Sequence, residues 1–439
     1  MMQAGLTRPE SGQHNVAGPS RIAYLLSQYP AVSHTFFLGE ILMMRQQGFH
    51  IETASINAIR PPADGFSTIE MEEVAQTFYV KQTSKLLILQ TILNTLLTQP
   101  GVIWRGLREA VRLTPWDLRG MSYAVFYLIE AILVGAWMRR KGCDHLHVHF
   151  SGPVATVAML TSIAWKVPYS LTVHGPDEFF EVTRSFLAKK VHHAKFVTCI
   201  SFFARSQLLR LSPPDTWDKF HVCRLGVHTE VFAPVDRAEP KTLHILSVGR
   251  LHPSKGQIFL LKAFSKLLAQ GLPIRLSIVG GGTEREALQR YIDENLLGDS
   301  VTLHGALSHA STRQLLGSAD LFVLSSFAEG VPVALMEAMA MEIACVSTFV
   351  AGTPELIEHG KEGLLVPPAS EEALAGAMAK LLSDGGLRQS LARAGRRKVL
   401  ENYNIAINIG RLVEVFELHD LSRPAAPSSS AVSIPYSRA

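Results

Sequence analysis

The chain has 439 residues, more than a single hydrophobic core usually organises, so we expect two domains. Hydrophobic residues make up 47% of the sequence and charged residues 18%, which supplies enough apolar side chains for large buried sheets and excludes a disordered chain. The formal net charge is only +4, so the composition gives no indication of a nucleic-acid partner.

Cysteine usage and the chain ends point to an intracellular protein. The four cysteines have no paired spacing that would indicate a disulfide framework or a zinc site, which fits the reducing cytoplasm; they are Cys143, Cys199, Cys223 and Cys345. Residues 1–20 are polar, rich in Gly, Ser and Pro, and lack the apolar centre of a signal peptide. We expect this segment and the similar tail at 422–439 to be disordered.

The first half of the chain contains a series of short apolar runs that are typical of buried strands. The predicted strands are 22–26, 51–56, 78–80, 145–150, 169–173, 196–201 and 221–225. Residues 86–140 are predicted to be helical and are unusually apolar. The run 123–134 approaches the length of a membrane span, but it carries Glu130 and is followed by Arg139 and Arg140. We therefore expect a helix of the core or of a membrane interface, with peripheral membrane contact as a hypothesis.

The strand at 145–150 carries three alternating histidines, His145, His147 and His149, which must share one face. Such a row suggests a metal site, but no carboxylate or cysteine partner stands nearby in the sequence. We therefore expect no metal here.

The second half alternates between strands and helices with regularity beyond a linker at 232–240. This alternation predicts a parallel, doubly wound sheet. The predicted strands are 243–248, 275–279, 301–303, 321–324 and 345–348, and the last helices are 371–382, 387–400 and an amphipathic segment at 403–418.

The strand at 321–324 runs into a loop that contains Glu329 and Gly330, and Pro332 suits the first position of the following helix. Open α/β sheets bind ligands at this end of their strands, and the bare amides that begin a helix favour a phosphate. Glu337 lies five residues beyond Pro332, roughly 7.5 Å along the helix axis. The two glutamates could hold two hydroxyl-rich groups of one ligand, although loop glutamates are more often simply solvated.

A second glycine loop follows the strand at 243–248. Gly249 and Arg250 begin it, and Lys255 and Gly256 end it. The forked donors of arginine and the point charge of lysine could together neutralise a diphosphate, but charges after a strand are as often only solvated.

The run Gly280-Gly281-Gly282 could be a dinucleotide-binding fingerprint. The third glycine of that motif would fall at Arg285, and the ribose-binding acid is missing after the strand at 301–303. An NAD enzyme is therefore not expected, and the loop instead suits close approach of a nucleotide.

Two of these segments resemble the donor-site motifs of retaining GT-B glycosyltransferases of family 4, of the colanic-acid or exopolysaccharide type. The segments are Glu329-x7-Glu337, with Gly-x-Pro inside, and Gly249-Arg250-x4-Lys255-Gly256. The resemblance implies two Rossmann-like, doubly wound domains that face each other across a cleft. It places an acceptor domain at 21–232, a nucleotide-sugar domain at 241–402, and a helix at 403–420 that crosses back. It also implies a set of donor-binding residues: Gly249, Arg250, Lys255, Gly280, Gly281, Leu303, Gly305, Glu329, Gly330, Val331, Pro332, Val333 and Glu337.

Two segments of the first half resemble the same family. The segment with Ser33, His34 and Thr35 resembles a motif of this family that commonly has Glu where this chain has His34. The resemblance implies that these three residues contact the acceptor. The Thr-x-His-Gly-x-Asp segment implies that His174 lies beside the donor sugar and Asp177 near the acceptor. The implied catalytic residues are His174, Arg250, Lys255 and Glu329.

We thus expect a cytoplasmic enzyme, working at the inner face of the membrane, that moves a hexose from a nucleoside diphosphate to a lipid-linked glycan. UDP-hexose is favoured over GDP-mannose as the donor, and no cofactor is expected. The chain has no Asp-x-Asp, so protein cations would replace a metal. The alternatives are a sugar phosphorylase or epimerase on a related frame, and a lectin-like protein without activity.

Overall fold

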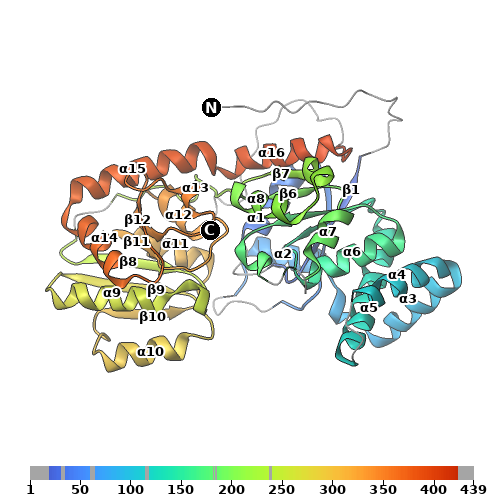
Figure 1. Ribbon diagram of the computed structural model, residues 1–439, viewed down its shortest axis with the longest axis horizontal. Helices are drawn as coiled ribbons and strands as arrows, with labels where there is room; N and C mark the ends of the chain where they lie inside the picture. Colours follow the sequence, from blue (N-terminus) through green and yellow to red (C-terminus); the bar gives the residue numbers. More distant parts are fainter. Residues whose placement is uncertain are drawn as a thin grey trace.

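The computed structural model describes residues 19–30, 35–59, 65–113, 118–180, 182, 185–236 and 240–423. Two sheets of parallel strands form the centres of two domains that lie side by side (Figure 1). The predicted disordered tails fall almost entirely outside the described residues, as do Ser33 and His34.

The N-terminal sheet has seven parallel strands in the order β3-β2-β1-β4-β5-β6-β7. Their bounds are β1 Arg21–Leu26, β2 His50–Ser55, β3 Phe78–Tyr79, β4 His145–His149, β5 Tyr169–Val173, β6 Val197–Cys199 and β7 Phe220–Val222. The order reverses between β1 and β4, so the loops after these two strands diverge and leave a crevice at their carboxyl ends.

The helices of this domain cover both faces of the sheet, and several of them are almost wholly apolar on their inner side. Their bounds are α1 Thr35–Gln46, α2 Thr68–Gln76, α3 Lys85–Thr98, α4 Pro100–Arg112, α5 Leu118–Lys141, α6 Pro153–Trp165, α7 Leu187–His193 and α8 Phe202–Leu211, with short 3₁₀ turns η2 Val80–Gln82, η3 Pro176–Phe179 and η4 Pro214–Lys219.

The C-terminal sheet has six parallel strands in the order β10-β9-β8-β11-β12-β13. Their bounds are β8 Leu243–Val248, β9 Ile274–Val279, β10 Val301–Gly305, β11 Leu321–Leu324, β12 Ala344–Thr348 and β13 Leu364–Val366. The last strand was not predicted, because three residues between two prolines and a glycine carry too little periodicity to indicate a strand.

The helices of the C-terminal domain alternate with its strands. Their bounds are η5 Pro253–Lys255, α9 Gln257–Ala269, α10 Arg285–Glu294, α11 His309–Gly317, α12 Val333–Ala340, α13 Thr353–Leu356, α14 Glu371–Ser383 and α15 Gly385–Asn402. The order of the strands reverses between β8 and β11, which makes the loops after these strands the expected ligand-binding edge.

The last helix, α16 (Ile405–Leu418), returns to the N-terminal domain, and α15 and α16 run along one side of both domains in Figure 1. Phe416 is fully buried against Phe49 and Phe196 of the first domain. At the crossing, the Val227 amide donates to the Tyr403 carbonyl at 2.9 Å, and the Ile405 amide donates to the Val227 carbonyl at 3.1 Å. These bonds join the end of the C-terminal domain to the N-terminal one.

The apolar helix expected near residues 123–140 is α5. Residues 120–141 are long and apolar enough to cross a membrane, and the bent pair α3 and α4 passes the same test. However, Val134, Trp137 and Met138 are buried in the core beneath the N-terminal sheet. The second half of α5 is therefore a core helix, as expected.

Candidate active site

A cleft of about 1250 Å³ lies between the two domains, at the carboxyl ends of both sheets. From the C-terminal domain, the loops after β8, β9 and β11 line it, and from the N-terminal domain the loop after β5 and the first half of α5 do so. Both sheets therefore direct the ends of their strands into one space, which is where α/β proteins of this kind bind their ligands.

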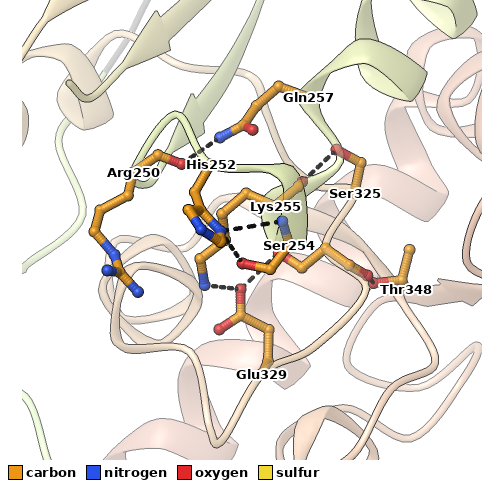
Figure 2. A network of polar contacts seen from close by, with 9 residues as sticks. Arg250, His252, Ser254, Lys255, Gln257, Ser325, Glu329 and Thr348 are labelled. Carbon is orange, nitrogen blue, oxygen red and sulfur yellow. Dashed lines mark hydrogen bonds and ion pairs between the residues drawn. The ribbon is translucent and has the colours of Figure 1, made fainter. Parts of the chain in front are cut away.

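Lys255 and Glu329 form an ion pair at the C-terminal side of the cleft (Figure 2). Lys255 Nζ donates to Glu329 Oε1 at 2.6 Å, and the Ser326 hydroxyl donates to the same oxygen at 2.6 Å. The Glu329 residue is only 8% exposed. The carboxylate is therefore held in one position by two donors, and its charge is balanced by the lysine rather than by water.

The two loops that carry this pair are joined through their backbones. The Phe327 amide donates to the Ser254 carbonyl at 2.8 Å, and the Ser325 hydroxyl donates to the Lys255 carbonyl at 3.2 Å. Gly256 has a φ of 59°, and a Cβ there would lie 2.4 Å from the Ser325 carbonyl oxygen. The sequence Lys255-Gly256 thus allows the loop after β8 to turn closely against the loop after β11.

Arg250 follows β8 directly and also lines the cleft. Its carbonyl accepts a hydrogen bond from Gln257 Nε2 at 2.9 Å, while its side chain is exposed. In Figure 2 the guanidinium of Arg250 and the amine of Lys255 extend to the same side of their loop. A doubly negative group in the cleft could meet both cations.

The glycine loop after β9 packs against the backbone on either side of Arg250. Gly280 has a φ of 147°, and a Cβ there would lie 1.9 Å from the Gly249 carbonyl oxygen. Gly281 accepts a hydrogen bond from the Leu251 amide at 2.9 Å. Gly280 is therefore needed so that the two loops touch, and both Gly280 and Gly281 line the cleft.

Glu337 lies on α12 with its side chain buried, and His309 at the start of α11 is its partner, with Nε2 at 3.1 Å from Oε1. Burial alone would lower the pKa of His309, but the hydrogen bond and the charge of Glu337 raise it above its ordinary value. His309 lines the cleft and was not predicted from the sequence. In the sequence, the feature that could have indicated His309 was its position shortly after the predicted strand at 301–303.

The start of α12 also faces the cleft, through Val331, Pro332 and Val333. Pro332 takes the N-cap position, one residue earlier than predicted, and the helix begins at Val333. Leu303 packs against the core of the domain, and the Gly305 carbonyl accepts a hydrogen bond from the Gly280 amide at 2.8 Å. The cleft lining after β10 is formed by the next two residues, 306 and 307.

On the opposite side of the cleft, His174 follows β5 and is 6% exposed. A Cβ on Gly330 would lie 1.9 Å from the His174 carbonyl oxygen, and one on Gly175 would lie 2.8 Å from Gly330 Cα. The Glu329-Gly330 turn therefore touches the His174-Gly175 turn across the domain boundary. This contact brings His174 and the Lys255–Glu329 pair to the same part of the cleft.

Of the residues predicted to contact the acceptor, Asp177 is exposed and lines the cleft on the N-terminal side. Thr35 begins α1, but its side chain lies outside the described part of the structure. Its role and those of Ser33 and His34 stay predictions.

Two family models match consecutive parts of the chain. Residues 98–231 match the model described as Glycosyltransferase Family 4, and residues 230–398 match the model described as Glycosyl transferases group 1. Together they cover more than half of the 439 residues. The chain belongs to the family 4 glycosyltransferases.

Relatives of this glycosyltransferase extend over nearly its whole length. It is 26% identical over 421 residues to the amylovoran biosynthesis glycosyltransferase AmsK of Erwinia amylovora, covering 90% of this chain and 99% of AmsK. It is 27% identical over 398 residues to the protein named for colanic acid biosynthesis, WcaL of Escherichia coli, covering 88% of this chain and 96% of WcaL.

Solved structures share the fold. Anabaena HepE, in a complex with UDP and glucose, has a TM-score of 0.69 at 15% identity, covering 91% of this chain and 99% of HepE. Sucrose-phosphate synthase from Thermosynechococcus elongatus has a TM-score of 0.68 at 20% identity, covering 90% of this chain and 98% of the synthase. The glycosyltransferase therefore has the predicted GT-B fold.

Behind His174, a row of buried polar groups leads away from the cleft of the glycosyltransferase. His174 Nε2 lies 3.0 Å from His149 Nδ1, His149 Nε2 lies 3.2 Å from Glu40 Oε1, and the Tyr24 hydroxyl donates to Glu40 Oε1 at 3.0 Å. His149 thus lies between His174 and the buried Glu40 carboxylate, and its hydrogen bond to His174 fixes the position of that ring.

No carboxylate stands near the histidine strand in the sequence, but α1 brings Glu40 to within reach of it in the fold. Atoms of Glu40, His147 and His149 lie within 4.8 Å of one another, as in some metal sites. However, His147 Nδ1 already lies 2.7 Å from the Ser170 hydroxyl, and its Nε2 lies 3.0 Å from the Thr172 hydroxyl. Both ring nitrogens of His147 are engaged, so a metal could bind this group only by displacing one of these hydroxyls.

Replacement of Glu40 by alanine should lower the free energy of unfolding by about 1–3 kcal/mol, because the buried Tyr24 hydroxyl loses its acceptor. Urea-induced unfolding measures this. Tyr24→Phe removes the donor itself and should cost less. An unchanged free energy of unfolding in Glu40→Ala would show that this buried contact contributes nothing to stability.

Proposed function

We propose that this glycosyltransferase moves a hexose from a nucleoside diphosphate to a glycan acceptor with retention of the anomeric configuration. The observation that carries the proposal is the meeting of Arg250, Lys255 and the start of α12 on one side of the cleft, opposite His174. Cations and helix amides together are what a diphosphate leaving group requires.

The chemistry follows from the charge that develops during transfer. When the bond between the anomeric carbon and the diphosphate oxygen breaks, negative charge collects on the leaving diphosphate. Arg250 and Lys255 stabilise it without any divalent metal, and such stabilisation is often the largest part of catalysis. The acceptor oxygen attacks the anomeric carbon from the same face, and its proton passes to the departing phosphate oxygen. No covalent nucleophile is assigned.

The remaining groups of the cleft give each part of the donor a partner. Glu329 is placed to accept hydrogen bonds from hydroxyls of the sugar, once the diphosphate competes for Lys255. Glu337, fixed by His309, is placed to accept hydrogen bonds from the ribose. His174 lies opposite Glu329, on the side from which the sugar and the acceptor meet.

The pathway is inferred from relatives. AmsK is named for amylovoran biosynthesis, WcaL for colanic acid biosynthesis, and HepE binds UDP and glucose in its structure. We infer for this chain a UDP-hexose donor, ahead of GDP-mannose, and a lipid-linked acceptor in the synthesis of an exopolysaccharide or another cell-surface polysaccharide. The enzyme would work in the cytoplasm at the inner face of the membrane.

A thermal-shift screen tests the donor class. A nucleotide at about 100 times its Kd stabilises the folded protein by about 2.7 kcal/mol, so UDP or GDP should raise the unfolding temperature of the 439-residue chain by about 3 °C. Free glycans alone should have little effect. Stabilisation by glycans but not by either nucleotide would instead indicate a lectin-like protein. With the active donor and its acceptor, the anomeric configuration of the product by NMR tests retention, and an inverted product would contradict it.

A further inference from the structure

Helix α3 has its polar and apolar faces reversed relative to a surface helix of a soluble domain. Thr91 and Thr95 are buried against the protein, and the Thr95 hydroxyl donates to the Thr91 carbonyl at 2.7 Å. The leucines point outward: Leu93 is 48% exposed and Leu97 is 82% exposed. A helix that faced only water would bury its leucines and expose its threonines.

The exposed apolar surface continues from α3 onto its two neighbours. α4 adds Trp104 and Leu107, at 69% and 40% exposure, and α5 packs against both helices. We call this surface the apolar face; it comprises Leu86, Leu87, Leu89, Leu93, Leu96, Leu97, Trp104, Leu107, Met121, Val125 and Phe126. In Figure 1, α3 and α4 lie at the outer end of the N-terminal domain, away from the C-terminal domain. So large an apolar patch marks a binding surface.

The charges that accompany the apolar face are almost all positive. Within residues 85–112 the basic side chains are Lys85, Arg105, Arg108 and Arg112, and Glu109 is the single acid. Glu109 is buried and lies 2.8 Å from Lys189 Nζ. Lys85, Arg108 and Arg112 are exposed, whereas Arg105 is half-buried and donates to the Ala164 carbonyl at 2.6 Å. Leucines and a tryptophan bordered by the three exposed cations match the acyl chains and anionic headgroups of a lipid surface.

The lengths of these helices suit the surface of a membrane rather than a span across it. α3 and α4 have 14 and 13 residues and are bent by 110° at their junction, whereas a span needs about 20 residues. The second half of α5 packs in the core of the N-terminal domain, where Val134 is fully buried. The apolar face can therefore enter only the interfacial layer of one leaflet.

We propose that the apolar face docks this glycosyltransferase on one leaflet of an anionic lipid bilayer. The face reaches the cleft through the first half of α5, where Tyr123 and Phe126 are exposed and line the cleft. A lipid-linked acceptor could then keep its chain in the leaflet while its sugar enters the cleft. This last step rests on the proposed transferase function, whereas the docking does not.

Binding to vesicles tests the docking. The purified full chain is floated with vesicles of phosphatidylcholine containing phosphatidylglycerol, and the bound fraction is compared for the wild type, Leu93→Gln/Leu97→Gln and the control Leu296→Gln. Leu296 is 90% exposed but lies in the C-terminal domain. We expect at least a tenfold loss of affinity in the double variant only, and weaker binding of the wild type to pure phosphatidylcholine. Equal binding by the double variant would overturn the proposal.

Tryptophan fluorescence locates the contact. Brominated acyl chains should quench the wild type, and Trp104→Phe should lose most of that quenching. A loss of self-association in the double variant, without any vesicle binding by the wild type, would assign the face to a second copy of the chain and overturn the proposal. Stabilisation by UDP or GDP should be equal in all variants, so a failure of the donor proposal would appear separately from a failure of docking.

Discussion

Replacing Lys255 by alanine should lower kcat by about 10²–10³-fold, the loss typical of removing one group that stabilises the charge of a transition state. The lysine lies 2.6 Å from Glu329 and shares the cleft with Arg250, so its removal leaves the leaving group with one side-chain cation fewer. Steady-state kinetics with the donor identified by the thermal screen measure the effect.

The same substitution leaves Glu329 Oε1 with the Ser326 hydroxyl as its donor, at 2.6 Å. We expect a loss of about 1–3 kcal/mol in the free energy of unfolding, because a buried acceptor loses a partner. Lys266→Ala is the matched control: this lysine lies on α9 and pairs at the surface with Glu371 and Glu372, so its loss should change neither quantity much. Normal turnover in Lys255→Ala would refute its role.

Gly330→Ala should be nearly as damaging to turnover, although it adds a single methyl group. That methyl would lie 1.9 Å from the His174 carbonyl oxygen, and the two turns must separate by about 1 Å to relieve the overlap. A displacement of that size between the two sides of an active site can cost on the order of 10²-fold in rate. We expect the rate of transfer to fall, while the affinity of the C-terminal domain for the nucleotide changes little.

Gly376→Ala is the control for this substitution. Gly376 lies within α14, and a Cβ there would meet nothing within 4 Å. Alanine in a helix is more favourable than glycine by about 1 kcal/mol, so this variant should be slightly more stable and fully active. If Gly330→Ala keeps wild-type turnover, the contact between the Glu329-Gly330 and His174-Gly175 turns is not needed for transfer.

The strand-to-loop junctions of the second half could be predicted from the sequence. Lys255 and Glu329 each follow a short apolar run, and parallel strands bring their carboxyl ends to one edge of the sheet, so the sequence alone placed both residues at the cleft. The glycines beside Arg250 were predictable for the same reason. What the sequence could not give is their pairing, since the 2.6 Å contact depends on how closely the two loops pack.

The residues that the sequence missed owe their roles to contacts between distant elements. His309 gains importance only because α11 and α12 place it beside Glu337, and Glu40 only because α1 packs over β4. The sequence also did not reveal that α3 buries its threonines and exposes its leucines, because a helical spacing of Leu and Thr does not say which face turns inward. Tertiary packing decides each of these points.

A crystal structure of the protein with the nucleoside diphosphate that stabilises it most would test the proposed donor site directly. We expect the diphosphate oxygens to lie within hydrogen-bonding distance of Arg250 and Lys255, at the start of α12, with the ribose hydroxyls at Glu337. A diphosphate bound elsewhere, with Lys255 still paired only to Glu329, would contradict it.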